Sequence, residues 1–501
     1  MVRRALAMAT GEQYFRLAIN FVSILTISRL LTPTEVGVSV IGLGIMTIAL
    51  GLREFATSDF LIQRAEVTQE DTRASFTVAF LLTALIGSLM FVLAPWFGTF
   101  YGEEQLAHFV RVAAVAGLIE ATSLPITGLL RRDLAFGTLA LINTASAAVV
   151  ALATIVLALA GFSYMSVAWA TLAGAGTTTL LSFYFRPDLS ILRPAFRCWG
   201  NVLRFGGYQG ASFVINRTYE ALPQLVLGHL LPHAAVGLYN RAVLVSDIPD
   251  KIVLASASYV AFPALAAETR QGRSLKEPYL RALGYITVLF WPALVLLGIL
   301  AYPTVLILLG DQWLAVVPLL QVMAVAGLAW FPVMLTTPVL MAVGANRDRV
   351  LAVLVTRAVS GFVLCCSAYF GVMAMAVSRL ATHPFQMVIC LWFVRRHVAF
   401  PWSDVWVALW KSAVVTVSSA AGPACVVGLS DTGFDLPIAP TVVAVILAVV
   451  GWLAGVLATQ HSVLLELEKA IHALTATSFA RRCWRLRDRI IAYGPKARGA
   501  R

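Results

Sequence analysis

Two stretches of the chain place amide, hydroxyl and guanidinium groups at helical spacing inside apolar sequence. The first set is Gln13, Arg16, Asn20 and Ser23, and the second is Gln209, Ser212, Asn216 and Glu220 with Arg217 beside it. Spacings of three and four put each set on one face of a helix. A charge at bilayer depth costs roughly 2.5 to 3.5 kcal/mol, so we expect these faces to line a water-filled cavity. Their groups can hydrogen-bond hydroxyls, and Arg16 and Arg217 favour an anionic ligand.

Other charges in apolar segments extend the set of candidates. The segment 36–62 carries Arg53, Glu54 and Asp59, and the segment 235–263 carries Asn240, Arg241, Asp247, Asp250 and Lys251. The predicted binding residues are Arg16, Asn20, Arg53, Asn216, Arg217, Glu220, Arg241 and Arg357. Internal ion pairing or a position near the headgroups is the alternative for Arg53 with Glu54 and for the acidic cluster ending at Lys251. Arg357, Arg379 and His383 could pair with other groups of the second half, and Glu120 has no assigned role.

The sequence shows no pattern that indicates catalysis. It has no Walker loop, and no His and carboxylate cluster has metal-ligand spacing, so we predict neither an enzyme nor a cofactor or metal site. The six cysteines indicate neither a disulfide framework nor a zinc site. In a membrane protein a net charge of +12 more often reflects basic cytoplasmic loops than nucleic-acid binding. No nucleic-acid module is visible in the sequence.

The elements that must position the polar faces are membrane-spanning helices. Hydrophobic residues make up 59% of the 501-residue chain and charged residues 12%, which indicates an all-α polytopic membrane protein. Since a span needs about 20 apolar residues, the chain offers about fourteen. They are 12–31, 36–62, 74–98, 105–129, 136–160, 162–185, 206–231, 235–263, 281–309, 313–343, 349–370, 372–394, 411–429 and 438–459. Prolines inside them, Pro125 and Pro332 among them, should kink their helices.

The basic residues give the expected orientation. Most of the 37 lysines and arginines fall on alternate connections, and the intervening turns, around Thr34, Gly102, Gly161, His233, Asp311, Gly371 and Asp431, hold none. By the positive-inside rule both termini are cytoplasmic. No small-residue cleavage site closes the first apolar stretch, so the first helix should remain in the mature protein. Residues 461–501 read as a basic amphipathic tail on the inner membrane surface, or as a solvated tail that only fixes the orientation.

A repeated corner predicts an internal duplication. Ser28 to Gly37 and Gly228 to Gly237 share Leu-Leu, Val-Gly and a turn proline at a fixed offset, and both lie between long apolar runs. We therefore predict two pseudo-symmetric six-helix lobes, at 1–205 and 206–394, followed by two additional helices within 395–460. The two polar stripes would then face each other across the pseudo-two-fold interface.

The corner also resembles a known family. Arg29 to Gly37 is similar to the first-hairpin signature of the polysaccharide transport (Wzx-like) branch of the multidrug/oligosaccharidyl-lipid/polysaccharide exporter superfamily. Leu230 to Tyr239 is similar to the second-half pattern of that branch, and Leu61 to Arg64 matches its second-helix exit. The resemblance implies a flippase for undecaprenyl-diphosphate-linked oligosaccharides, the repeat units of lipopolysaccharide, capsule or exopolysaccharide. It also implies fourteen helices, alternating access and a place in the bacterial inner membrane.

Elementary chemistry agrees with this implication. A sugar-diphosphate head loses its hydrogen bonds in hydrocarbon, whereas a cavity with Asn and Gln for hydroxyls and Arg for the diphosphate would replace them. A polysaccharide polymerase and a chain-length regulator would be the expected protein partners. Alternatives are a peptidoglycan-precursor lipid flippase and a cation-coupled multidrug or metabolite exporter. A membrane glycosyltransferase or polymerase is disfavoured because every predicted outer turn is short.

Overall fold

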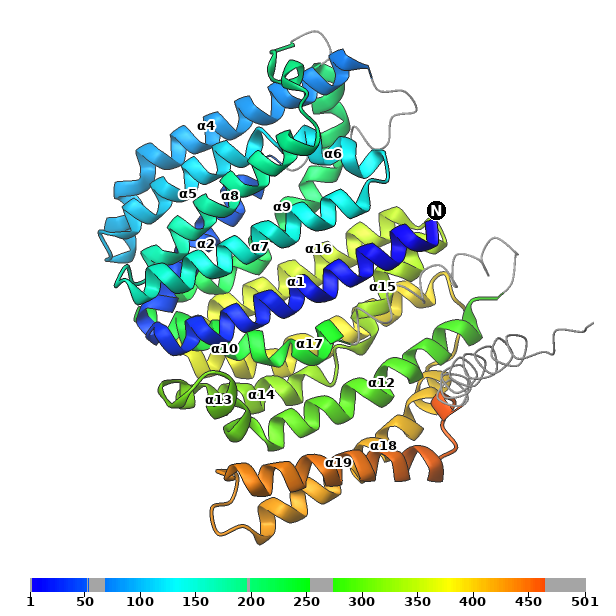
Figure 1. The fold of residues 1–501 in the computed structure, drawn as a ribbon. Coiled ribbons are helices and arrows are strands. Elements are labelled where there is room, and N and C mark those ends of the chain that lie inside the picture. Colours follow the sequence, from blue (N-terminus) through cyan, green and yellow to red (C-terminus); the bar gives the residue numbers. More distant parts are fainter. Residues whose placement is uncertain (1, 52, 54–67, 196–198, 253–273, 465–501) are drawn as a thin grey trace, which may run out of the picture. The chain divides into compact units, whose positions relative to one another are not determined.

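The computed structural model describes residues 2–51, 53, 68–195, 199–252 and 274–464, and every regular element among them is a helix (Figure 1). Seven of these helices are long and apolar enough to cross a membrane, or nine if each of two bent pairs is one span. The predicted all-α membrane class is therefore confirmed. The tail from residue 465 onward, Glu54, Asp59 and the distal parts of the predicted helices 36–62 and 235–263 lie outside the described residues.

The chain divides into two compact units, of which the first is Met1–Ile248 with Leu300–Val394. Its helices in the first half of the chain are α1 (Val2–Leu30), α2 (Pro33–Gly51), α4 (Gln69–Tyr101), α5 (Leu106–Ala121), α6 (Leu124–Arg132), α7 (Phe136–Leu159), α8 (Met165–Phe185) and η2 (Leu189–Leu192). Those in the second half are α9 (Trp199–Leu230), α10 (His233–Ser246), α13 (Ala301–Leu308), η3 (Asp311–Val316), α14 (Val317–Gly327), α15 (Phe331–Ala342), α16 (Asn346–Ala368) and α17 (Val372–Arg395).

The second unit is Pro249–Ile299 with Arg395–Arg501. Its described helices are α12 (Lys276–Ile299), α18 (Trp402–Leu429) and α19 (Ile438–Ala458), and α18 packs against both of the others. Val288, Val415 and Val456 form the buried core of this group. The division into lobes at 1–205 and 206–394 stays a prediction.

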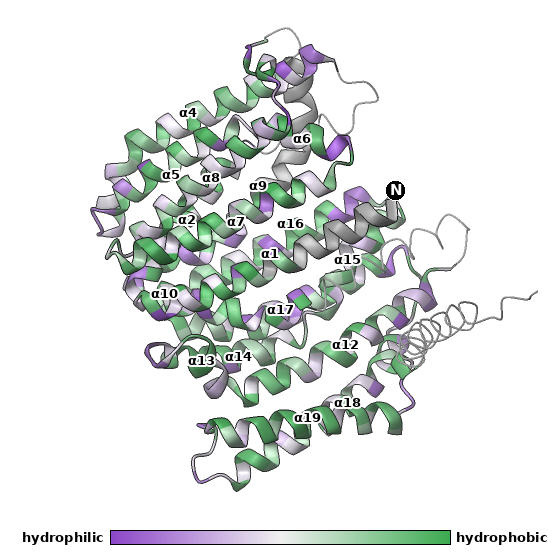
Figure 2. Cartoon of the chain, in the orientation of Figure 1, coloured by the Kyte–Doolittle hydropathy of each residue, from purple (hydrophilic) through white to green (hydrophobic). Residues whose placement is uncertain are grey.

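Over the residues that the structure describes, the predicted apolar segments coincide with one helix or with consecutive helices. Figure 2 shows apolar residues along most of the helix bodies. Helices α1, α8, α9, α10 and α17 occupy predicted spans, but their described residues do not reach the length and apolar composition of a span. Several of them carry the charged or polar side chains predicted to avoid lipid. Their place in the fold therefore depends on protein or cavity contacts more than on burial in hydrocarbon.

Three breaks follow from proline chemistry. Helices α5 and α6 bend by 43°, and α14 and α15 bend by 47°. Pro125 and Pro332 lie just after these bends, because a proline has no N–H to donate to the carbonyl four residues earlier. The predicted kinks at both prolines are confirmed, and the fourth helix of each half bends by nearly the same angle. The predicted helix 281–309 is likewise divided at Leu300, three residues before Pro303.

The two repeated corners meet at a helix crossing. Helices α2 and α10 start at equivalent positions, Pro33 and His233, and pack against each other. A Cβ atom on Gly37 would lie 1.9 Å from the carbonyl oxygen of His233, and one on Gly237 would lie 2.1 Å from the carbonyl oxygen of Pro33. The crossing is therefore reciprocal, and it requires glycine at both positions because the two backbones leave no room for a side chain.

Each corner is also bonded to the other half of the first unit. Arg29 Nη2 donates to the carbonyl oxygen of Ile307 in α13 at 2.6 Å. His229, at the equivalent position, lies 3.3 Å from the carbonyl oxygen of Phe100 in α4, and its ring stacks on the Phe100 ring at 4.1 Å. The two corners thus make equivalent contacts on one side of the bundle, as the predicted duplication requires.

Candidate functional site

A cavity of about 430 Å³ lies within the first unit. Its walls come from α2, α5, α7 and α8, with one residue from α9. Small residues, Ala113, Gly117, Gly174 and Ala175 among them, leave the space open. The charged residues in the lining are Glu120 and Arg217. A single acid and a single base in a wall of small residues can bind a polar ligand from two sides.

Hydroxyl groups supply the rest of the polar lining. Thr47, Ser146, Thr171 and Thr178 reach the cavity. Thr178 Oγ1 donates to Ser146 Oγ at 2.9 Å, and Ser146 Oγ donates to the carbonyl oxygen of Gly174 at 3.1 Å. This chain of donors fixes the hydroxyls and couples α7 to α8. Hydroxyls held in this way can hydrogen-bond a ligand that carries several oxygen atoms.

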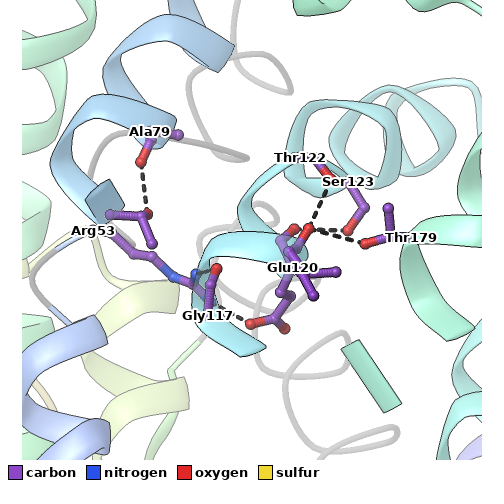
Figure 3. Close-up of polar contacts among 9 residues, drawn as sticks. Arg53, Ala79, Gly117, Glu120, Thr122, Ser123 and Thr179 are labelled. Atoms are coloured by element: carbon purple, nitrogen blue, oxygen red, sulfur yellow. Dashed lines mark hydrogen bonds and ion pairs between the residues drawn. The ribbon is translucent and has the colours of Figure 1, made fainter. Parts of the chain in front are cut away.

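Arg53 contacts two residues of the cavity wall, Glu120 and Gly117, from outside the lining. It follows the end of α2, is 6% exposed, and forms an ion pair with Glu120 near the end of α5. Its Nη1 also donates to the carbonyl oxygen of Gly117 at 2.8 Å, as Figure 3 shows. The Glu120 side chain is 44% exposed, so one carboxylate serves both the buried guanidinium and the cavity. For Arg53 the structure therefore favours internal ion pairing, the alternative that its sequence context left open.

Arg217 is the predicted binding residue that the structure places in this cavity. Its Nη1 lies 3.1 Å from Glu220 Oε2, one turn along α9, and the side chains of both residues are partly exposed. Glu220 was also predicted, so the structure brings two candidates together. Asn216 lies half-buried beside them on the same helix. On the described part of α9, Arg217 and Glu220 thus lie together, and Arg217 lines the first-half cavity.

The polar face of α1 has a different environment. Arg16 and Asn20 are exposed, whereas Ser23 is buried. Helix α1 packs along α7, and none of its side chains that the structure describes lines the cavity. The predicted meeting of the α1 and α9 stripes stays a prediction.

The second-half arginines are held by aromatic rings. Arg241 is 6% exposed and lies 5.5 Å from the Trp313 ring centre. Arg357 lies 4.3 Å from the ring centre of Tyr219, and Arg379 lies 5.4 Å from that of Tyr239. A guanidinium over an aromatic face is attracted by the ring quadrupole, which does not neutralise the charge as a carboxylate does. The rings position these guanidinium groups, and Asp247 also interacts electrostatically with Arg379. Sequence reasoning identified Arg241 and Arg357 but missed their aromatic partners.

The cavity offers hydroxyl, carboxylate and guanidinium groups to a ligand. Among the described residues no group of three or more His, Cys, Asp or Glu could hold a metal ion. Glu120 is the cavity residue that sequence reasoning left without a role. The sequence did contain a signal for its role, because an acidic residue in one apolar helix and an arginine in another stabilise each other at bilayer depth. Its pairing with Arg53, however, depends on how two helices cross.

Comparisons with known proteins place the chain among membrane proteins of surface-polymer synthesis. A family model described as polysaccharide biosynthesis protein matches residues 26–318. The lipopolysaccharide biosynthesis protein WzxC of Escherichia coli is 24% identical over 62% of this chain and 64% of its own. The teichuronic acid biosynthesis protein TuaB of Bacillus subtilis is 26% identical over 54% of this chain and 56% of its own. The chain thus spans less than two thirds of the length of each of these relatives.

Solved structures show the same fold at low sequence identity. The lipid II flippase MurJ in an inward closed conformation superposes with a TM-score of 0.72 over 90% of this chain and 98% of its own, at 11% identity. An inward-facing multidrug resistance transporter of the MATE family superposes with a TM-score of 0.61 over 77% of this chain and 94% of its own, at 16% identity. The chain has the helical architecture of these transporters.

Proposed function

From the premise that this chain belongs to the polysaccharide biosynthesis protein family, we propose that it is a flippase for polyprenyl-diphosphate-linked oligosaccharide repeat units. The units would serve lipopolysaccharide, capsule or exopolysaccharide synthesis. The protein is then a transporter and not an enzyme. It acts in the bacterial inner membrane with both termini in the cytoplasm, and it works by alternating access.

The cavity between α2, α5, α7 and α8, with Arg217 at its wall, carries this proposal. A sugar-diphosphate head loses its hydrogen bonds in hydrocarbon, and each unsatisfied polar group costs several kcal/mol. Hydroxyls at Ser146 and Thr178 can replace water around the sugar, and a guanidinium can form two parallel bonds to phosphate oxygens. The lipid tail stays in the bilayer while the head moves. Arg217 in the cavity wall favours an anionic cargo.

The substrate is tested by deleting the gene. Cells without the protein should lose a surface or secreted polysaccharide and accumulate lipid-linked repeat units on the cytoplasmic leaflet. Unchanged polysaccharide with heightened sensitivity to cationic drugs would instead support an exporter of cationic compounds, in which Glu120 would be the binding group. A polysaccharide polymerase and a chain-length regulator are the expected partners, and their loss should leave flipping itself intact.

The cavity is tested by substitution at Arg217 in complemented cells. Arg217→Gln keeps hydrogen bonding but removes the charge, so export should fall by at least about ten-fold at wild-type abundance. Arg217→Lys keeps the charge without the two-pronged geometry and should recover part of the export. The matched control is Arg347→Gln, an exposed arginine at the start of α16. Normal export by the Arg217→Gln protein would make Arg217 structural and move the search to Arg16, Arg53, Arg241 or Arg357.

A further inference from the structure

A second pocket, of about 280 Å³, lies in the first unit and shares no lining residue with the cavity. It is formed by the start of α4, the end of α6, the end of α8 and η2. Its lining residues are Thr68, Gln69, Thr72, Arg73, Leu129, Arg132, Asp133, Arg186, Asp188, Ser190 and Ile191. We propose that this pocket binds the phosphate headgroup of an anionic phospholipid in the cytoplasmic leaflet. The proposal requires the predicted orientation of the chain but not the identity of its cargo.

The pocket is a built structure and not a gap under a loose loop. Ile191 of η2 is 2% exposed and packs into a core with Ile126 and Leu130 of α6. Arg73 Nε donates to the carbonyl oxygen of Ser190 at 3.0 Å. Further along, the Ala195 N–H donates to Thr77 Oγ1 of α4 at 2.9 Å. The segment that follows α8 is therefore fixed to α4 and α6, and the pocket keeps its shape without a ligand.

The charges in the pocket favour an anion. Three arginines from three elements, Arg73, Arg132 and Arg186, stand against Asp133 and Asp188. Asp133 is paired with Arg186 at 2.6 Å, and Asp188 accepts the N–H of Ser190 at 3.1 Å and its hydroxyl. Arg73 instead donates to two neutral oxygens, the Ser190 carbonyl and Gln69 Oε1. Neutral acceptors position a guanidinium without neutralising it, so the Arg73 charge is available to a phosphate.

Two leucines at the pocket edge indicate that the anion belongs to a lipid. Leu134 directly follows Asp133 and is 60% exposed, and Leu189 directly follows Asp188 and is 68% exposed. Leu134 also has a φ of 55°, a left-handed conformation that a residue other than glycine rarely adopts. Leu134 lies between α6 and α7, and Leu189 is the first residue of the four-residue η2, so neither belongs to a long apolar helix. An acyl chain beside the headgroup would cover both, and basic pockets at the cytoplasmic surface are suited to anionic headgroups.

The test measures lipid binding by the purified full chain in detergent, using native mass spectrometry. Phosphatidylglycerol is titrated against phosphatidylcholine with the same acyl chains. We expect the wild-type protein to prefer phosphatidylglycerol, and we expect Arg73→Gln and Arg132→Gln each to weaken that binding by about ten-fold, the effect of losing one charge-assisted bond. Arg131→Gln is the matched control, because Arg131 is exposed and adjacent but does not line the pocket. Leu189→Ser should weaken phosphatidylglycerol binding as well.

The comparison arms decide between sources of the phosphate. Inorganic phosphate that competes as well as the phospholipid, with no effect of Leu189→Ser, would assign the pocket to a soluble anion and overturn the proposal. Tighter binding of undecaprenyl phosphate than of phosphatidylglycerol would make it a cargo site and overturn the proposal too. Equal losses in the Arg131→Gln protein would reduce the effect to general surface charge. Phosphatidylglycerol binding at the wild-type level by both Arg73→Gln and Arg132→Gln would also refute the proposal. A folding defect could not produce that result.

Discussion

The Arg53 guanidinium and the Glu120 carboxylate join two helix ends across the wall of the cavity. Arg53 follows the last residue of α2, and Glu120 is the penultimate residue of α5, next to the bend with α6. The two exposures differ, since the Arg53 side chain is 7% exposed and that of Glu120 is 44% exposed. The buried Arg53 charge is therefore stabilised mainly by Glu120, whereas the Glu120 carboxylate is also accessible to solvent.

A double-mutant cycle on this pair should give a coupling free energy of roughly 1 to 3 kcal/mol. Arg53→Gln and Glu120→Gln each remove one charge, and the double variant should be more stable than the sum of the single losses implies. The measurement is reversible unfolding in detergent. The control cycle uses Asp133 and Arg186, whose side chains are 52% and 33% exposed, and an exposed pair is worth about 0.2 to 1 kcal/mol. Equal coupling in the two cycles would contradict a structural role for the Arg53 pair.

Substitution of Gly37 or Gly237 by Ala should destabilise the protein by about 1 to 3 kcal/mol, the usual cost of overpacking. The added methyl would lie about 2 Å from a backbone oxygen of the facing helix, so α2 and α10 must move apart. Gly176→Ala is the control, because no atom lies within 4 Å of its Cβ position and alanine favours helix. The check is the unfolding midpoint in detergent together with polysaccharide export. A Gly37→Ala protein as stable as the Gly176→Ala protein would show that the crossing is not maintained in the membrane.

The turn between α18 and α19 should be periplasmic. A cysteine at Asp431, in a protein whose native cysteines are replaced, should react with a membrane-impermeant maleimide in intact spheroplasts. Asp431 is exposed, and so is Gln460 just beyond the other end of α19. A cysteine at Gln460 should react only after the membrane is permeabilised. The reverse pattern would invert the predicted orientation of this helix pair.

The second unit should lose stability in acid because of His461, which is 3% exposed just beyond α19. Its Nδ1 accepts the Val463 N–H at 3.2 Å, so Nε2 carries the proton and donates to Ser412 Oγ at 3.3 Å. Burial, together with the nearby Lys411 charge, lowers the pKa of His461 below its ordinary value of 6.5. The unfolded chain therefore takes up a proton before the folded one does. Stability is retained above pH 6.5 and falls as the pH drops below it, by up to about 1.4 kcal/mol per pH unit.

Unfolding midpoints at pH 7.5 and pH 5.5 check this expectation. The His461→Gln protein keeps an acceptor and a donor but does not titrate, so its loss of stability over this range should be smaller than that of the wild type. Lys411→Gln should raise the pKa of His461 toward its ordinary value and so partly reduce the loss of stability in acid. An identical acid response of wild type and His461→Gln would place the titrating group elsewhere.

The helices were predictable because apolar length and proline position are local properties of the sequence. Pro125 and Pro332 marked two of the bends correctly. The repeated corner indicated that Ser28 to Gly37 and Gly228 to Gly237 are equivalent, but their crossing became apparent only in the structure. The break at Leu300 was missed because Pro303 lies inside a continuous apolar run, where hydropathy gives no signal.

The candidate site was harder to predict, since it depends on which helix faces meet. Periodicity placed Arg217 beside a polar face of its helix, but it left open which other helices share that cavity. Two contacts join residues that are remote in sequence: Arg53 forms an ion pair with Glu120, and Arg241 lies over the Trp313 ring. Nothing local to either partner identifies the other.

The crossing of Gly37 with Gly237 has the geometry of an isologous interface, in which one surface meets a copy of itself. Six helices are an even number, so a predicted half of this chain starts and finishes on the same face of the membrane. Two such halves enter in parallel, and a two-fold axis along the membrane normal relates them. An ancestral single-half protein would have paired as a homodimer with the same glycine facing its own copy. In a fused chain each half is free to differ, as the ion-paired Arg53 and the ring-stacked Arg241 do, whereas the glycine at the crossing is not.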